Sequence, residues 1–270
     1  MNAAIPMISV ITPSYNQGAY IEQTIRSVLD QNYGHVEHIV IDGGSTDDTV
    51  EILKRYPHLI WISEKDRGQA DALNKGLRLA RGEIVGWINS DDYYQPSIFG
   101  SVARHFRSSG AQWVIGNVAN LYEGDPKVIF RRSLSISLEA LLREPDIVKQ
   151  QAAFFLRQAL IAAGGWNADC YMVMDYDLWV RLARISAPAM VDENWAYFRN
   201  HGAQKSMHGN ILRQSAEIAA ILRRERVPVH RIASLRAKKR WYWIKGLAKE
   251  RLLRLGVVPQ RYRTRSIREK

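Results

Sequence analysis

The first ninety residues alternate between short apolar runs and amphipathic segments, and this alternation constrains the fold more than any other feature. Apolar residues in the segment 20–29 recur at spacings of three and four, which predicts a helix with one buried face. The predicted strands are 7–11, 36–41, 59–62 and 84–88, and the predicted helices between them are 20–29, 50–56 and 70–80. Such alternation predicts an α/β fold with a mainly parallel sheet flanked by helices, and ligands gather at the carboxyl ends of its strands.

After Pro96 the regularity weakens, and charge divides the remainder of the chain. Residues 223–270 hold 17 lysines and arginines against three glutamates, a local charge of +14, whereas residues 1–222 carry −3 of the total +11. We therefore expect one domain over 1–222 and a basic amphipathic helical tail over 223–270. Further elements are predicted as helices at 97–106 and 175–183 and as strands at 113–115, 152–156 and 195–199.

The predicted tail mixes basic residues with apolar and aromatic ones, including Trp241 and Trp243. This pattern suits a helix on an anionic membrane surface, and it suits equally a helix that packs its tryptophans on the body. The acidic body carries no nucleic-acid motif, so no nucleic-acid partner is expected. A single cysteine, Cys170, and no signal-peptide pattern predict a cytoplasmic protein, peripheral on the cytoplasmic membrane face.

Acidic residues follow predicted strands or begin a predicted helix at three places: Asp42, the pair Asp91 and Asp92, and Asp175 with Asp177. Any one of them could be a turn residue or a helix cap. Several at one edge of a parallel sheet repel one another unless a cation or ligand compensates them. Because hard divalent ions take carboxylate oxygens and substrate phosphates, the pair predicts a Mg²⁺ or Mn²⁺ site for a diphosphate-bearing substrate.

Glycine-rich phosphate loops are missing from the sequence after the first predicted strand. The segment 12–16 reads Thr-Pro-Ser-Tyr-Asn there, in place of a P-loop or a G-x-G-x-x-G fingerprint. This argues against a P-loop NTPase and against a conventional dinucleotide-binding oxidoreductase. Phosphates held by a metal ion are the alternative that the acids support.

Five motifs together resemble the family-2 inverting glycosyltransferases of the GT-A fold. They are ISVITPSYN at 8–16, IDGGSTDDT at 41–49, WINSDD at 87–92, MDYDLW at 174–179 and YFRNH at 197–201. The resemblance extends over residues 7 to about 206, in the family's order. It implies a GT-A-like, Rossmann-type sheet and an inverting transfer of sugar from a nucleotide-diphosphate sugar, UDP- or GDP-linked.

The resemblance also implies a nucleotide site. In it, Thr12, Pro13 and Tyr15 line the base pocket and Asp42 hydrogen-bonds the base, while Asp66, Ser90 and Asp91 match further nucleotide positions. Family members often carry a second acid where Gly43 stands, so that contact is missing here. The loop around Asp66 could also be a charged surface loop.

The implied metal site departs from the family pattern in one position. Asn89 replaces the first acid of the D-x-D motif, so Asp91, Asp92 and His201 are the expected ligands of a divalent cation, Mn or Mg. A lone histidine is more often structural, which is the alternative for His201.

Catalysis and acceptor binding are expected from the later motifs. The resemblance implies that Asp175 is the general base, although Met174 stands where the family has a glutamate before it. Asp177 is the competing candidate for the base. If Asp175 is the base, Asp177 is expected to bind the acceptor. Gln150 and Gln151 are expected in the acceptor cleft, or else they satisfy buried backbone groups. The expected acceptor is a saccharide or a lipid-linked one in polysaccharide biosynthesis. The alternatives are a nucleotidyltransferase and a catalytically inactive binding or membrane scaffold protein.

Overall fold

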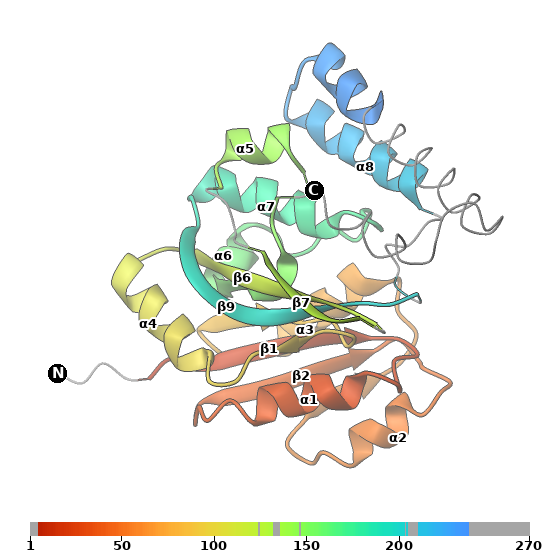
Figure 1. The fold of residues 1–270 in the computed structure, drawn as a ribbon, viewed down its shortest axis with the longest axis vertical. Helices are drawn as coiled ribbons and strands as arrows, with labels where there is room; N and C mark the ends of the chain where they lie inside the picture. The colour runs from red at the N-terminus through yellow and green to blue at the C-terminus, as the bar shows by residue number, and fades with distance from the viewer. Residues whose placement is uncertain are drawn as a thin grey trace. The chain divides into compact units, whose positions relative to one another are not determined.

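The structure is a computed structural model that describes residues 5–123, 125–131, 136–145, 147–202, 204 and 210–237 (Figure 1). It divides into two compact units, 1–204 and 205–270. The boundary expected from charge, after residue 222, falls inside the helix α8 (Ile211–Arg224) of the second unit. A further helical stretch covers 229–237. Most of the predicted tail, with Trp241 and Trp243, lies outside the described residues, so its membrane contact stays a prediction.

The first half of the larger unit is the predicted alternation of strands and helices. Its strands lie side by side in the order β3-β2-β1-β4, and all of their pairings are parallel. The elements are β1 (Ile8–Ser14), α1 (Ile21–Leu29), β2 (Val36–Asp42), α2 (Thr49–Lys54), β3 (Ile60–Ser63), α3 (Gln69–Leu79) and β4 (Ile84–Trp87). The predicted α/β class is confirmed, because each apolar run became a strand and each amphipathic segment a helix.

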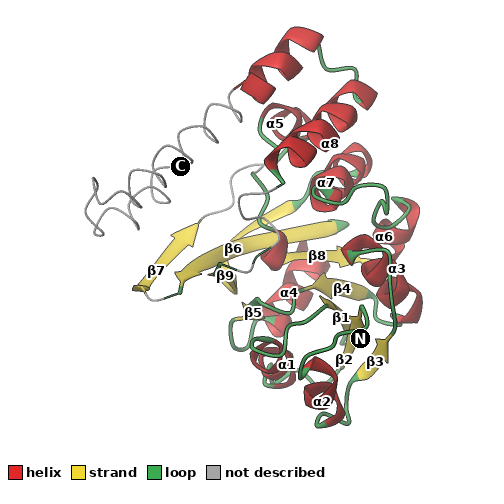
Figure 2. Ribbon diagram, turned by 90° about the vertical axis from the view of Figure 1, so that its right-hand side faces the viewer, coloured by secondary structure: helices red, strands yellow, loops and turns green. Residues whose placement is uncertain are grey.

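Helices cover both faces of these strands (Figure 2). Val40 of β2 packs among apolar residues of α1 and α2, and successive strand residues point to opposite faces. On the other face, α3 approaches β1 so closely that a Cβ on Gly76 would lie 2.4 Å from Ile11 Cγ2. Gly76 therefore permits the helix to pack against the strand.

The second half of this unit extends the sheet with strands of both directions. The order continues β4-β8-β6-β9-β5, and β7 pairs with β6 (Figure 2). Its strands are β5 (Tyr93–Tyr94), β6 (Trp113–Tyr122), β7 (Asp125–Arg131), β8 (Ala153–Leu156) and β9 (Ala189–Asn200). Because β5 follows Asp92 directly and pairs with β9, the end of β9 is brought beside the end of β4. This pairing carries a late segment of the chain to the predicted site.

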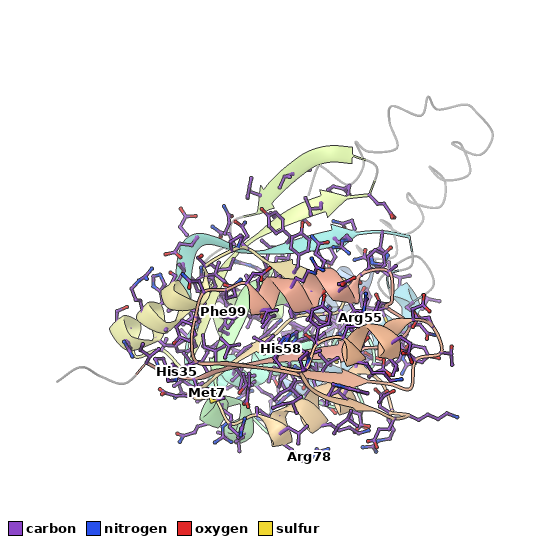
Figure 3. All side chains as sticks on the ribbon, turned by 90° about the horizontal axis from the view of Figure 1, so that it is seen from below. Met7, His35, Arg55, His58, Arg78 and Phe99 are labelled. Carbon is purple, nitrogen blue, oxygen red and sulfur yellow. The ribbon has the colours of Figure 1, made fainter. Side chains whose placement is uncertain are left out.

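The remaining helices close the layers around this part of the sheet. They are α4 (Phe99–Ser109), α5 (Leu138–Arg143), the short 3₁₀ helix η1 (Gln150–Ala152), α6 (Arg157–Ala162) and α7 (Met174–Ile185). Phe99 of α4, labelled in Figure 3, is fully buried with Tyr94, Phe154 and Trp195 in one aromatic core. A stack of Trp113, Phe155 and Trp179 fastens α7 to β6 and β8, with ring centroids 5.7 and 5.5 Å apart. None of the helices that the structure describes has the length and apolarity to cross a membrane.

Candidate functional site

The predicted nucleotide residues lie where the parallel strands end. Asp42 ends β2, between Ser14 of β1 and Ser63 of β3. Its carboxylate is fully buried, and Oδ2 accepts hydrogen bonds from Gly44 N (3.1 Å), Ser45 N (2.9 Å) and Ser63 Oγ (2.6 Å). The side chain thus holds the turn after β2 in shape. The expected contact of Asp42 with the nucleotide base stays a prediction.

Tyr15 offers the one accessible ring at the end of β1. Thr12 is fully buried, with Oγ1 2.9 Å from His38 Nε2, and Pro13 is buried too. Tyr15 is 60% exposed. Of the three residues expected to line a base pocket, the side chains of Thr12 and Pro13 therefore face the interior, and the ring of Tyr15 is available for stacking.

Gly43 lies between the Tyr15 ring and the Asp66 carboxylate. A Cβ at Gly43 would be 3.0 Å from Asp66 Oδ2 and 3.4 Å from Tyr15 Cδ2. Asp66 Oδ1 accepts a hydrogen bond from Gly68 N at 2.7 Å, which orients the carboxylate. The absent side chain at Gly43 thus leaves room between an aromatic face and an acid. The sequence alone indicates only that a family contact to the nucleotide is missing at Gly43. It does not show that Asp66 lies beside Gly43, because Asp66 is in the loop that follows another strand, β3.

The turn from Asn89 to Asp92 is fixed by neutral side chains. Asn89 Oδ1 accepts from Gln69 Nε2 (2.7 Å) and from Trp87 Nε1 (2.9 Å). The Thr24 hydroxyl of α1 contacts the carbonyls of Ser90 (2.9 Å) and Asp92 (2.6 Å). Ser90 is buried, at 4% exposure, and its nucleotide contact stays a prediction. The turn is therefore held rigid from both sides of the sheet.

The two neighbouring acids of this turn face different surroundings. Asp92 is fully buried, and its carboxylate accepts from Arg199 N and from Gln151 Nε2, each at 2.9 Å. Burial, and next the charge of Asp91, raise the pKa of Asp92 well above its usual range. The Asp91 side chain is 19% exposed, and its Oδ2 lies 3.1 Å from His201 Nε2. Asp91 is partly accessible, whereas Asp92 fastens the turn to the late segments. The expected role of Asp92 as a metal ligand stays a prediction.

His201 follows β9 and reaches Asp91 from inside the site, with a side chain that is only 1% exposed. Its ring lies against Tyr20, with centroids 4.4 Å apart, and its Nδ1 is buried without a hydrogen-bond partner among the described residues. No group of three metal-binding side chains occurs in the described part of the chain. Mg²⁺ is commonly held by one or two protein ligands together with phosphates and water. One carboxylate and one imidazole fit a cation of that kind, so Asp91 and His201 could hold it with substrate phosphates.

The two adjacent glutamines act behind the turn. Both are buried in η1, and Gln150 Nε2 donates to the Trp87 carbonyl at 2.6 Å. Gln151 bonds Asp92, as described above. Both glutamines thus satisfy buried groups of the site, as one of the two expectations had it. Their place in an acceptor cleft stays a prediction.

The first turn of α7 carries the two candidate bases, and the structure separates them. Asp177 is fully buried, and its Oδ2 accepts from Arg181 Nε at 2.8 Å. Arg181 also donates to the carbonyl of Ala163. Asp175 is partly exposed, and its Oδ1 accepts from Tyr176 N at 2.8 Å. Asp175 is therefore the more exposed of the two carboxylates of this turn.

Residues 9–164 match the family model described as Glycosyl transferase family 2. A putative teichuronic acid biosynthesis glycosyltransferase, TuaG of Bacillus subtilis, is 45% identical over 96 residues, which cover 33% of this chain and 38% of TuaG. Two solved structures share the fold. Staphylococcus aureus TarS 1–349 in complex with UDP has a TM-score of 0.63 at 18% identity, over 80% of this chain and 64% of that one. The mannosyltransferase PcManGT from Pyrobaculum calidifontis, with GDP-Man and Mn²⁺, has a TM-score of 0.58 at 21% identity, over 97% and 83%.

Proposed function

The chain belongs to glycosyltransferase family 2, and from this premise we propose that it transfers a sugar from a UDP- or GDP-linked donor to a hydroxyl of a saccharide or lipid-linked acceptor. The configuration at the anomeric carbon is inverted in this proposal. The observation that carries it is the pairing of one accessible acid, Asp91, with His201 at the edge where the parallel strands end. The relative TuaG, named for teichuronic acid biosynthesis, supports a role in polysaccharide assembly.

The donor nucleotide binds, in this proposal, between the ends of β1, β2 and β3. The exposed Tyr15 ring stacks on the base, and the carboxylate of Asp66 beside Gly43 accepts a hydrogen bond from a ring N–H. The neighbours TarS and PcManGT were solved with UDP and GDP-Man, which supports a donor of this class.

Asp91 and His201 would hold a divalent cation at the diphosphate end of the donor. A bound Mn²⁺ or Mg²⁺ would supply positive charge against the diphosphate, and PcManGT, which carries Mn²⁺, supports its presence. Asp92, Gln151 and the Arg199 backbone N–H keep Asp91 and His201 in place by tying the turn to β9. Both side chains are thus oriented before the donor arrives, which reduces the cost of reorganisation.

Asp175 acts on the acceptor. Its carboxylate takes the proton of the acceptor hydroxyl as that oxygen attacks the anomeric carbon, while the bond from this carbon to the diphosphate oxygen breaks. Attack from the side opposite the leaving group inverts the configuration. The proton ends on Asp175, and the nucleoside diphosphate leaves with the bonding electrons.

The test is a transfer assay with a panel of UDP- and GDP-linked sugars and saccharide acceptors, with the product's anomeric configuration read by NMR. Asp91→Ala removes an accessible ligand without disturbing the core, so we expect the folded variant to lose transfer by more than about 10²-fold. Asp48→Ala, at an exposed acid before α2, is the matched control. Full transfer by folded Asp91→Ala, or retention of configuration, would contradict the proposal.

Attachment to the membrane remains a further part of the proposal, carried by the +14 charge of residues 223–270. Each basic residue near an anionic surface contributes about 1 kcal/mol, so a chain ending near residue 225 should no longer sediment with anionic vesicles. Donor binding should survive, because the proposed donor residues all precede residue 202. Unchanged vesicle partition of the shortened chain would exclude this role.

A further inference from the structure

Asn16, the second residue after β1, has a backbone conformation that residues other than glycine rarely adopt. Its φ is +52°. This left-handed conformation is disfavoured for residues with a Cβ, although asparagine tolerates it better than most, and it gathers at ligand clamps and other functional sites. It persists only where the surrounding structure enforces it. The contacts that enforce it at Asn16 come from the loop that follows β2.

That loop engages both the backbone and the side chain of Asn16. The Asn16 backbone N–H donates to Ser45 Oγ at 2.7 Å, and Asn16 Oδ1 accepts from the Thr46 backbone N–H at 2.8 Å. The Ser45 hydroxyl in turn donates to Asp42 Oδ1. Asn16 is therefore fixed at two points, and through Ser45 it is connected to the buried carboxylate that shapes the turn after β2.

The next two residues are held by the same loop. The backbone N–H groups of Gln17 and Gly18 donate to Thr49 Oγ1 and Asp47 Oδ2, each at 2.9 Å. A Cβ on Gly18 would lie 3.2 Å from Asp47 Oδ2, so the glycine leaves room for this acid. Three consecutive backbone N–H groups thus meet the loop after β2, and the left-handed turn at Asn16 directs the chain toward it.

Tyr15 lies immediately before this turn. Ser14, the last residue of β1, is buried, whereas Tyr15 is 60% exposed, and its Cδ2 lies 3.4 Å from the position of a Cβ at Gly43. The direction of the Tyr15 side chain depends on the backbone on both sides of it, the strand before and the turn after. The bonds of Asn16 therefore hold the ring beside Gly43, where the proposed function places the base.

We propose that Asn16 is a positioning residue for the donor base, which holds the Tyr15 ring in its stacking orientation before the nucleotide arrives. This inference rests on the proposed function, because that function assigns base stacking to Tyr15. A ring that is already oriented loses little conformational freedom on binding, so more of the stacking free energy appears as affinity. Asn16 acts through Tyr15 and needs no contact with the nucleotide itself.

The experiment is a double-mutant cycle on nucleotide binding. Affinities for UDP and GDP are measured by calorimetry with Mn²⁺ present, and the diphosphate that the wild-type chain binds more tightly is used throughout. Tyr15→Ala should weaken its binding about 10-fold or more, because the stacking of the base on the ring is lost. Asn16→Ala should weaken it about 5- to 20-fold, since alanine disfavours the left-handed backbone and cannot accept from the Thr46 N–H.

The combined variant tests whether the two residues act as one. In the Tyr15→Ala chain, the added change Asn16→Ala should weaken binding by less than about twofold, because no ring remains to be positioned. Asn16→Gly keeps the left-handed backbone accessible and removes only the side-chain bond. Its effect in the chain that retains Tyr15 should therefore be about threefold, between wild type and Asn16→Ala.

Asn32 provides the matched control. It is exposed and left-handed like Asn16, with a φ of +49°, but it lies between α1 and β2, at the amino end of the parallel strands rather than their carboxyl end. Asn32→Ala should lower thermal stability about as much as Asn16→Ala does and leave binding of the diphosphate unchanged. An Asn16 with a structural role alone would behave as Asn32 does.

The outcomes distinguish this inference from the proposed function. A wild-type chain that binds neither UDP nor GDP overturns both proposals, and a Tyr15→Ala chain that binds as tightly as wild type overturns the stacking role on which the inference rests. A folded Asn16→Ala chain that binds as well as wild type overturns the role of Asn16 alone. An equal loss with and without the Tyr15 ring does so too. Folding is checked by circular dichroism, and if Asn16→Ala does not fold, Asn16→Gly takes its place in the cycle.

Discussion

The two halves of the candidate site are built over very different distances along the chain. In the parallel half, Tyr15, Gly43, Asp66 and Asp91 each follow their own strand within one βα unit. In the later half, contributions arrive from η1, α7 and β9: the contact of Gln151 with Asp92 spans 59 residues, and that of His201 with Asp91 spans 110. Local structure positions the site residues of the parallel half, whereas pairing between strands positions those of the later half.

This difference shows that a sequence motif fixes where a carboxylate lies, whereas its hydrogen-bond and ion-pair partners determine whether that carboxylate is buried or accessible. Asp91 and Asp92 are neighbours in one turn, yet the later half encloses Asp92 and leaves Asp91 accessible. On α7, Arg181 engages Asp177 while Asp175 stays partly exposed. Asp42 is engaged by its own turn. The following predictions test this division of roles, beginning with the largest effect.

Removing the proposed base should separate catalysis from binding. Asp175→Asn should lower turnover by about 10²- to 10⁴-fold, the contribution usual for a general base, with donor binding by calorimetry unchanged. The Asn side chain keeps an oxygen for the Tyr176 N–H, so the fold should hold. If Asp177→Asn folds and shows this pattern instead, the base lies two residues further along the helix.

Breaking the buried ion pair of α7 should affect stability rather than chemistry. Asp177→Ala leaves the Arg181 guanidinium without its counter-charge in a buried place, and the free energy of unfolding should fall by about 3–5 kcal/mol. Urea unfolding followed by circular dichroism measures it. Glu51→Gln, which removes the exposed ion pair with Lys54, serves as control and should cost less than about 1 kcal/mol. Equal effects of the two changes would contradict the structural role of Asp177.

The parallel half contains its own structural acid. Asp42→Asn replaces one acceptor oxygen by an NH₂ group facing the donors of Gly44, Ser45 or Ser63, so stability should fall by about 1–3 kcal/mol. Asp48→Asn, whose exposed side chain makes no cap hydrogen bond, should change it by less than about 0.5 kcal/mol. A loss of nucleotide binding with stability intact would instead return Asp42 to the base contact.

The smallest expected effect is on the pH dependence of stability, and it concerns His38 of β2, which lies beside Thr12 of β1. Burial, and next the charge of His58, lower the pKa of His38 to about 3. The folded state therefore keeps the ring neutral, while the unfolded chain takes up a proton below about pH 6.5. Stability from this group is present above pH 6.5 and declines as the pH falls toward 3, by about 1.4 kcal/mol at pH 5.5.

His38→Gln keeps a hydrogen-bonding group beside Thr12 without titrating in this range. Denaturant unfolding at pH 7 and pH 5.5 should therefore show a shallower loss of stability for this variant than for wild type. The exposed His35→Gln is the matched control and should leave the wild-type pH dependence unchanged. An identical pH dependence in His38→Gln and wild type would show that His38 is protonated in the folded protein.

The strands and helices were predicted correctly where the apolar residues follow a regular local pattern, and incompletely where they do not. The strands and helices up to residue 87 lie where the alternation places them, within a few residues. The short strand predicted at 113–115 is part of β6, which continues to Tyr122, and the one predicted at 195–199 is part of β9, which begins at Ala189. The helices α5 and α6 and the strand β7 were not predicted. Their apolar residues lack a clear period. In the structure β7 pairs with β6, α6 packs on β8 and α5 packs on α7.

The sequence by itself determined the α/β class, the family and the positions of Asp91, Asp175 and His201, since each depends on a periodic or contiguous pattern. Only the tertiary structure decided which carboxylates are accessible and that Gln150 and Gln151 support the turn from behind. It also placed the Arg199 guanidinium over the rings of Tyr20 and Tyr93. The reason is physical: the environment of a charged group depends on burial and on hydrogen-bond partners, and the partners of Asp91 and Asp92 lie 59 to 110 residues away along the chain.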